Sequence, residues 1–122
     1  MPQYRFGEIV EVSQVYDPNG VNPKPRPVLI ISRTADISAG EEILGVAIST
    51  KGIPPRPAKL PEDLVELPHS DSGTCRTGLR ERSVAKCRWL VRFSQERVLY
   101  KRGEAPGPRI EDVLRYLAPH KT

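Results

Sequence analysis

Proline and glycine divide this chain into short segments, which limits the folds that it can form. The 122 residues include 13 prolines and nine glycines, more than an average protein carries. Both residue types interrupt regular structure, so turns should be frequent and long helices absent. A chain of this length forms about one domain with one modest core. We therefore expect a single β-rich domain over residues 1–122.

The segments between these breakers have the composition and alternation of strands. Asp17 to Pro25, DPNGVNPKP, holds three prolines and a glycine and is expected to be a loop. The predicted strands are Phe6–Tyr16, Val28–Ser32, Ile43–Thr50, Asp63–Leu67 and Ser83–Phe93.

The last predicted strand alternates best and contains the one tryptophan. One face would carry Ala85, Cys87, Trp89, Val91 and Phe93, and the other Lys86, Arg88 and Arg92. Trp89 therefore fits a core anchor, and a platform for stacking bases is the alternative.

An amphipathic helix is expected near the end of the chain. Ile110, Val113, Leu114 and Leu117 follow the spacing i, i+3, i+4, i+7 after Pro108. Glu111 is placed to pair with Arg115. The apolar stripe has two open destinations, the rest of this domain or a partner subunit. Short strands followed by one helix favour a small, curled antiparallel barrel with a terminal helix.

The stretch KPRPVLIIS, residues 24–32, places an arginine between two prolines directly before a buried strand. Proline fixes its own φ and keeps the preceding residue out of the helical region. Arg26 is therefore predicted to be a pre-positioned cation in extended chain, at the margin of the core.

Positive charge is concentrated in one segment. Residues 74–102 hold nine basic and two acidic residues, a formal charge of +7 in a chain of net charge +4, so the remainder carries −3. This asymmetry is typical of a surface that meets a polyanion; a solvated face without function is the alternative.

The cysteines and the first residues of the chain indicate in which cellular compartment the protein is expected. Cys75 and Cys87 fit no zinc or redox spacing, so reduced thiols are expected. The start, MPQYRFGEIV, lacks the features of a secretion signal, and no run of 18 apolar residues occurs. We expect a soluble, intracellular protein that does not contact a membrane.

The order of these pieces resembles a known family. An opening FGEIVEV, a Pro/Gly-rich loop, RPVLIIS, a strand ending AIST and a later TGLRERSVAKCRWL resemble the MazF/PemK toxin–antitoxin growth inhibitors, over about residues 6–117. The resemblance implies a mainly β, SH3-like antiparallel barrel of the CcdB/PemK type with a C-terminal α-helix. It also implies a cytoplasmic homodimer with a groove across the dimer face.

The resemblance further implies a function for that groove. In this family the groove binds single-stranded RNA and cuts it without a metal or other cofactor, by attack of a ribose 2′-OH that leaves a cyclic phosphate. The same groove receives an antitoxin protein. A related branch instead poisons DNA gyrase, so the fold alone does not fix the target.

The matching motifs assign the family's site residues to positions of this sequence. Arg26 matches the arginine of the active site, where a planar guanidinium suits a phosphate. Ser49 and Thr50 lie where the family places a hydroxyl that contacts the scissile phosphate; a strand-end hydroxyl bonded to backbone is the alternative. The predicted RNA-binding residues, for which solvated loop arginines are the alternative, are Arg76, Thr77, Arg80 and Arg82.

This sequence departs from part of the family pattern. Some PemK-type members carry a histidine in the first loop, and residues 17–25 contain none. Glu81 and Ser83 occupy the positions of a family Arg and Asp. Glu81 could accept a proton only if its side chain pointed to the other face of a strand. His69 is either a groove residue or an exposed loop histidine.

Three functional hypotheses therefore stay open. The leading one is a toxin-like, metal-independent endoribonuclease with Arg26 stabilising the phosphate transition state. The second is a non-catalytic module that binds RNA or a protein through the same groove. The third is a gyrase-directed toxin.

Overall fold

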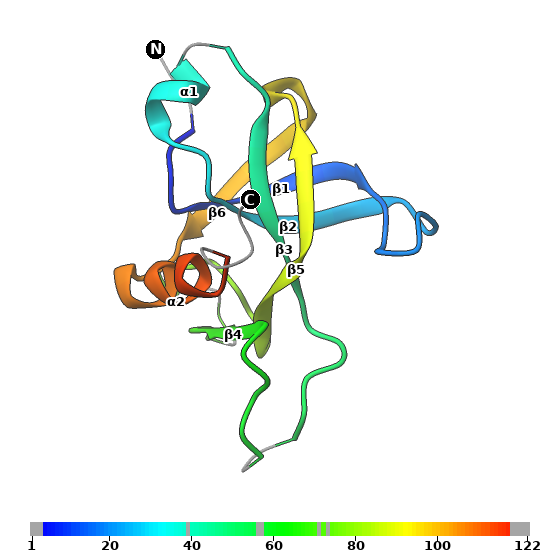
Figure 1. Cartoon of the computed structure of the whole chain (residues 1–122), viewed down its shortest axis with the longest axis vertical. Coiled ribbons are helices and arrows are strands. Elements are labelled where there is room, and N and C mark those ends of the chain that lie inside the picture. Colours follow the sequence, from blue (N-terminus) through cyan, green and yellow to red (C-terminus); the bar gives the residue numbers. More distant parts are fainter. Residues whose placement is uncertain (1–3, 39, 56–57, 71, 73, 118–122) are drawn as a thin grey trace.

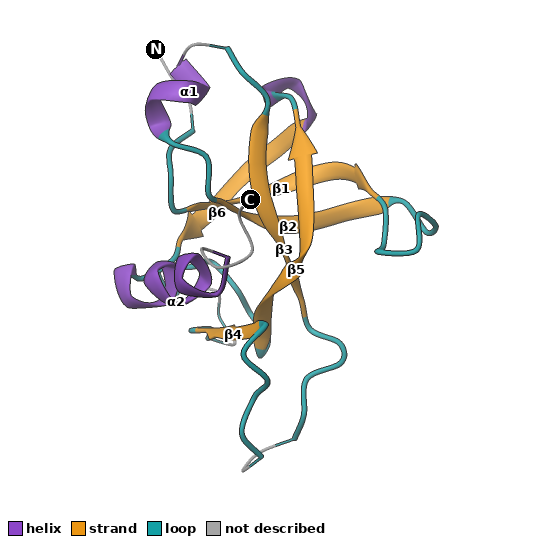
Figure 2. Cartoon of the chain, viewed as in Figure 1, coloured by secondary structure: helices purple, strands orange, loops and turns teal. Residues whose placement is uncertain are grey.

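The computed structural model describes residues 4–38, 40–55, 58–70, 72 and 74–117 as six strands and three helices (Figures 1 and 2). In chain order these are β1 (Glu8–Val15), β2 (Lys24–Ile30), α1 (Thr34–Ser38), β3 (Ile43–Ser49), β4 (Leu64–Leu67), β5 (Ser83–Phe93), the 3-10 turn η1 (Gln95–Arg97), β6 (Val98–Glu104) and α2 (Gly107–Leu117).

All neighbouring strands are antiparallel, in the order β4-β5-β3-β2-β1-β6. The expected class, mainly β with a C-terminal helix, is confirmed. Closure of the barrel is a correction, because β4 and β6 are the two edges and no ladder joins them among the described residues. Figure 2 shows the curl of the sheet, with β3 and β5 crossing the direction of β1, β2 and β6.

The predicted loop over residues 17–25 ends early, because β2 already begins at Lys24. Arg26 therefore lies within a strand instead of before one. Proline is tolerated here because this half of β2 pairs only with β1, whereas the ladder to β3 starts at Val28. Pro25 and Pro27 thus remove no hydrogen bond that β3 would need.

Strand β5 serves two cores, one on each face of the sheet. Val46 of β3 pairs with Leu90 of β5, whereas Ile48, two residues further along β3, pairs with Ala85. Strand β5 bends at this irregularity. The buried alternation is as predicted, but the single predicted face is wrong: Ala85 and Cys87 belong to one cluster and Trp89 and Phe93 to the other.

Helix α2 covers the first cluster, which settles the destination of its apolar stripe within this chain. Val113 and Leu117 are buried there, with Ile110 packed against them. Arg115 pairs with Asp112 at 3.0 Å and not with Glu111 as predicted. Within the described residues, no helix has the length and apolar character that a membrane crossing requires.

Candidate functional site

Arg26 is held by three segments of the chain. Its Nε donates to the carbonyl of Val15 at 3.0 Å, and its Nη2 donates to the carbonyl of Asn22 at 3.1 Å. Its guanidinium carbon lies over the ring of Trp89, 5.0 Å from the centroid. All three contacts are to uncharged groups, so the guanidinium is fixed in place without a hydrogen bond to a carboxylate. The prediction of a pre-positioned cation is confirmed.

The chain just before the loop is shaped to supply the carbonyl of Val15. β1 has a bulge between Val12 and Val15, where Gln14 adopts φ +51°. Arg97 holds this bulge, because its Nη2 donates to the carbonyls of Ser13 and Gln14 at 2.7 and 2.8 Å. Sequence reasoning counted Arg97 only as part of a basic segment and missed this role.

Asp17 organises the loop between β1 and β2. Its Oδ1 accepts from the backbone N–H groups of Asn19 and Val21, each at 3.0 Å, and its Oδ2 accepts from the Asn22 side-chain amide at 3.1 Å. The bond from Val21, helped by Asn22, Asn19 and the nearby charge of Arg26, lowers the pKa of Asp17 below 3.8. Asp17 is therefore an ionised structural group that presents Asn22 to Arg26.

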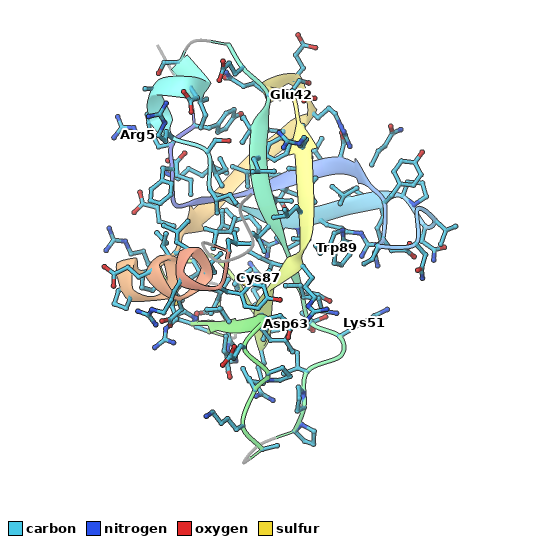
Figure 3. All side chains as sticks on the ribbon, in the orientation of Figure 1. Arg5, Glu42, Lys51, Asp63, Cys87 and Trp89 are labelled. Atoms are coloured by element: carbon cyan, nitrogen blue, oxygen red, sulfur yellow. The ribbon has the colours of Figure 1, made fainter. Side chains whose placement is uncertain are left out.

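A groove of about 520 Å³ lies beside Arg26, between the β1–β2 loop, the end of β3 and the bend of β5. We call it the Arg26 groove. Its charged and hydroxyl-bearing walls are Asp17, Lys24, Arg26, Ser49, Lys51 and Lys86, with Trp89 beside them. Figure 3 shows Lys51 in the connection after β3 and Trp89 on the side of β5 that faces the β1–β2 hairpin. Four cations against one carboxylate make this groove suited to a polyanion.

The predicted hydroxyl residues border the same place. A smaller hollow of about 160 Å³ is lined by Arg26, Ser49, Thr50 and Ser83, among others. The Ser49 Oγ accepts a hydrogen bond from the backbone N–H of Lys51 at 3.1 Å. This contact leaves its own O–H free to donate, so the backbone role and a ligand role are compatible. The structure thus brings Arg26, Ser49 and Thr50 together.

The cations of the Arg26 groove differ from most other cations in being unpaired. In the described part of the chain, Lys24, Arg26, Lys51 and Lys86 form no ion pair with a carboxylate. Eight other basic residues do: Arg33, Arg76, Arg82, Arg88, Lys101, Arg102, Arg109 and Arg115. Sequence analysis placed Lys86 on the polar face of the strand Ser83–Phe93 without assigning it a role, and it did not consider Lys24 or Lys51. Only Lys86 belongs to the +7 segment.

The segment that was predicted to bind RNA lies outside the lining of the Arg26 groove. Arg76 pairs with Glu104 at 3.0 Å, at the end of β6. Arg82 pairs with Glu66 at 3.2 Å and donates to the carbonyl of Pro54 at 3.0 Å.

Thr77 and Arg80 differ from these two arginines. Thr77 is fully buried, and its Oγ1 donates to the carbonyl of Pro68 at 2.8 Å and accepts from the N–H of Leu79 at 3.2 Å. Arg80 is exposed. RNA contact by this segment stays a prediction. The buried hydrogen bonds of Thr77 indicate that this residue supports the fold of the segment.

The residues considered as proton acceptors do not line the Arg26 groove. Glu81 is exposed, and its backbone carbonyl accepts from Ser83 Oγ at 2.8 Å. His69 borders a different shallow hollow, together with Pro68 and Arg109. The one carboxylate that the described groove contains is Asp17, whose oxygens already accept three hydrogen bonds.

Trp89 also lines a second hollow, of about 380 Å³. It shares Asp17, Pro18 and Trp89 with the Arg26 groove. Tyr16 and Leu90, each about half exposed, and the basic residues Arg88, Arg92 and Arg97 contribute to its walls. Trp89 thus lines two hollows that both carry basic residues.

The cysteines are both free thiols with different surroundings. Burial, with a contribution from the charge of Asp63, raises the pKa of Cys87 to about 11. Hydrogen bonds from the backbone and hydroxyl of Thr77 lower the pKa of Cys75, which is partly exposed. In the described residues, no three His, Cys, Asp or Glu side chains gather as a metal-binding group.

The sequence of this chain matches the model of one protein family. The family model described as "PemK-like, MazF-like toxin of type II toxin-antitoxin system" matches residues 5–120. No curated protein matches the chain.

Three solved structures share the fold. An endoribonuclease from a mycobacterial species has a TM-score of 0.68 at 13% identity, with 98% of this chain and 91% of that chain covered. MazF from Deinococcus radiodurans has a TM-score of 0.71 at 17% identity, with 96% and 94% covered. An endoribonuclease in complex with its cognate antitoxin, from a mycobacterial species, has a TM-score of 0.67 at 15% identity, with 95% and 92% covered. At these identities the likeness shows the fold.

Proposed function

Since this chain belongs to the PemK-like, MazF-like toxin family of type II toxin–antitoxin systems, we propose that it is a toxin that cuts single-stranded RNA in the Arg26 groove. The observation that supports this most is the guanidinium of Arg26, which is fixed by neutral groups and borders Ser49, Thr50 and three unpaired lysines. A fixed cation that forms no ion pair stabilises charge that develops on a phosphate without rearranging during the reaction.

The proposed reaction needs no bound cofactor. The 2′-hydroxyl of one ribose gives its proton to water as its oxygen attacks the adjacent phosphorus, the bond from phosphorus to the 5′-oxygen breaks, and the 5′-oxygen takes a proton from water. The products are a 2′,3′-cyclic phosphate and a free 5′-OH. In this mechanism Arg26 donates to the non-bridging oxygens of the transition state through Nη1, which bonds to no described residue and is not buried.

The other groove residues have supporting parts in the proposal. The hydroxyl groups of Ser49 and Thr50 donate hydrogen bonds to oxygens of the same phosphate. Lys24, Lys51 and Lys86 attract the neighbouring phosphates of the strand. Because three hydrogen bonds hold the carboxylate of Asp17 in the loop, we assign it to the loop and not to proton transfer. Catalysis then depends mainly on electrostatic stabilisation.

Assembly belongs to the same proposal. We infer that the protein acts in the cytoplasm as a homodimer, and that an antitoxin silences it by covering the Arg26 groove. One structural neighbour is an endoribonuclease in complex with its cognate antitoxin, which makes an antitoxin a reasonable partner for this chain. An antitoxin segment that occupies a basic groove should be acidic.

A non-catalytic binding module is the second candidate. The observation that favours it is the lining of the Arg26 groove, where the described residues include no histidine and one carboxylate, that of Asp17, which three hydrogen bonds hold in the loop. Such a module would bind RNA with an affinity that falls steeply with salt and would leave the RNA intact.

The deciding experiment incubates the purified protein with several unrelated long single-stranded RNAs in EDTA and analyses the ends of the products. Discrete cuts ending in cyclic phosphate, lost in Arg26→Ala and kept in Arg33→Ala, support the endoribonuclease. Arg33 is a suitable control because it is an exposed arginine paired with Asp36 on α1. Intact RNA with salt-dependent binding indicates the binding module, and induced DNA breaks without RNA loss indicate a gyrase-directed toxin.

A further inference from the structure

Trp89 is the only tryptophan of the chain, and its ring is the one aromatic surface found against Arg26 in the described structure. It lies on β5 in the second core cluster and is 9% exposed. A cation over an indole face is attracted by the electrons of the ring, and the attraction grows when water is excluded. The pair therefore has an energetic reason to stay in contact.

The ring supplies a restraint that the two hydrogen bonds of Arg26 lack. The carbonyls of Val15 and Asn22 accept from Nε and Nη2, which lie in the plane of the guanidinium. Hydrogen bonds in that plane set its direction and resist tilting only weakly. A flat ring over the guanidinium carbon limits tilting, because the cation loses contact with the ring face as it turns.

The polar edge of the indole indicates more than a core role. Its Nε1–H donates to no described residue, and it is not among the buried side-chain atoms that lack a partner. The edge therefore reaches the surface, where Trp89 lines both the Arg26 groove and the second hollow. A tryptophan with only a core role would more often bury its N–H against an acceptor.

We propose that Trp89 is a positioning residue, which holds the guanidinium of Arg26 at the tilt needed to meet a phosphate. This inference rests on the proposed function of the Arg26 groove. Orientation matters more for the transition state than for RNA capture, which the groove lysines also support. Loss of the ring should therefore lower kcat more than it raises KM.

The kinetic test compares three variants on one cut site of a labelled single-stranded RNA. We expect Trp89→Leu to lower kcat about 5- to 20-fold with little change in KM, since it removes the ring. Trp89→Phe keeps a ring and should stay within about threefold of the wild type. The matched control is Phe93→Leu, which changes a buried aromatic of the same strand and cluster that does not line the Arg26 groove. It should lower Tm and leave kcat unchanged.

A double-variant cycle distinguishes positioning from general damage. If Trp89 acts through Arg26, then Trp89→Leu should cost nothing further in the Arg26→Ala background. Equal losses of kcat in both backgrounds, or a loss in Phe93→Leu as large as that in Trp89→Leu, would overturn the proposal.

A second measurement does not depend on RNA. The Nε–H of Arg26, protected by its bond to Val15, gives a proton resonance that the indole ring current should displace. The displacement should shrink in Trp89→Phe and vanish in Trp89→Leu. Uncut RNA with the wild-type chain would defeat the proposed function, whereas an unchanged Arg26 resonance in Trp89→Leu would defeat the positioning inference.

Discussion

Two groups of cations in the molecule differ in their surroundings. Around β2 and the turn after β3, the cations Lys24, Arg26 and Lys51 border a groove and have no carboxylate partner in the described residues. Around residues 74–82, Arg76 and Arg82 pair with Glu104 and Glu66. The comparison teaches that the density of positive charge along a sequence does not locate the surface where that charge remains available.

The largest expected difference between the two regions is catalytic. Arg26→Ala should lower RNA cleavage about 100-fold or more, as expected when one fixed donor to a charged transition state is lost. Arg76→Ala should change it by less than about threefold, since a distant surface cation acts only through screened attraction. Cleavage rates with far-UV circular dichroism as a folding control would measure this. Comparable losses in the two variants would remove the contrast between the regions.

The second expected difference is in stability and is larger in the 74–82 segment. Thr77→Val leaves the carbonyl of Pro68 and the N–H of Leu79 without their buried partner, which should lower the free energy of unfolding by about 1–3 kcal/mol. Thr77→Ser keeps the hydroxyl and should retain most of the stability. Urea denaturation of both variants tests this. Wild-type stability combined with lost RNA binding in Thr77→Val would instead point to direct RNA contact.

The third expected difference concerns RNA affinity and its dependence on salt. Replacing Lys24, Lys51 and Lys86 by Gln should weaken RNA binding and reduce the slope of log K against log salt by about 2, since each phosphate contact to a single strand contributes about 0.7. The matched control replaces Lys101, Arg109 and Arg115, all paired with carboxylates, by Gln. Fluorescence anisotropy over a salt series gives both slopes, and equal slopes would refute the distinction between paired and unpaired cations.

The smallest expected effect comes from the loop that supports Arg26. Hydrogen bonds from Val21, Asn22 and Asn19 lower the folded-state pKa of Asp17 below its usual value, so its carboxylate stabilises the loop at neutral pH and loses this role as the pH falls through the lowered pKa. Asp17→Asn should remove the acid-sensitive stabilisation of the loop. It should also increase hydrogen exchange at the amides of Asn19 and Val21 at neutral pH. Exchange followed by NMR between pH 2 and 6 would check it, and unchanged protection of Val21 would show that the carboxylate is dispensable.

Local sequence patterns predicted much of the fold because burial on a strand or helix is periodic. Alternation identified β5 and the i, i+3, i+4, i+7 spacing identified α2. β6 was not predicted, since it is an edge strand in which consecutive residues Leu99 and Tyr100 are both about half exposed. The double use of β5 was also missed, because the bend depends on pairing with β3.

The candidate site was predictable only where local chemistry fixes geometry. Two prolines restrict the chain around Arg26, so its extended conformation could be inferred from neighbours in sequence. Ion pairing could not be inferred in this way, because Arg76 and Glu104 are 28 residues apart and meet only in the folded sheet. The three groove lysines were overlooked for the same reason. Whether a cation is free depends on tertiary neighbours that the sequence does not display.

The placement of core residues on both faces of one sheet has a consequence for how the protein unfolds. Ile9 and Val10 are adjacent in β1 and lie in different clusters, as do Val46 and Ala47 in β3. Opening either cluster therefore removes packing contacts from strands that also carry the other cluster. The chain should then unfold as one cooperative unit. A molecule bound in the Arg26 groove would then raise the protection of α2, on the opposite face, by the same free energy that it adds beside β2.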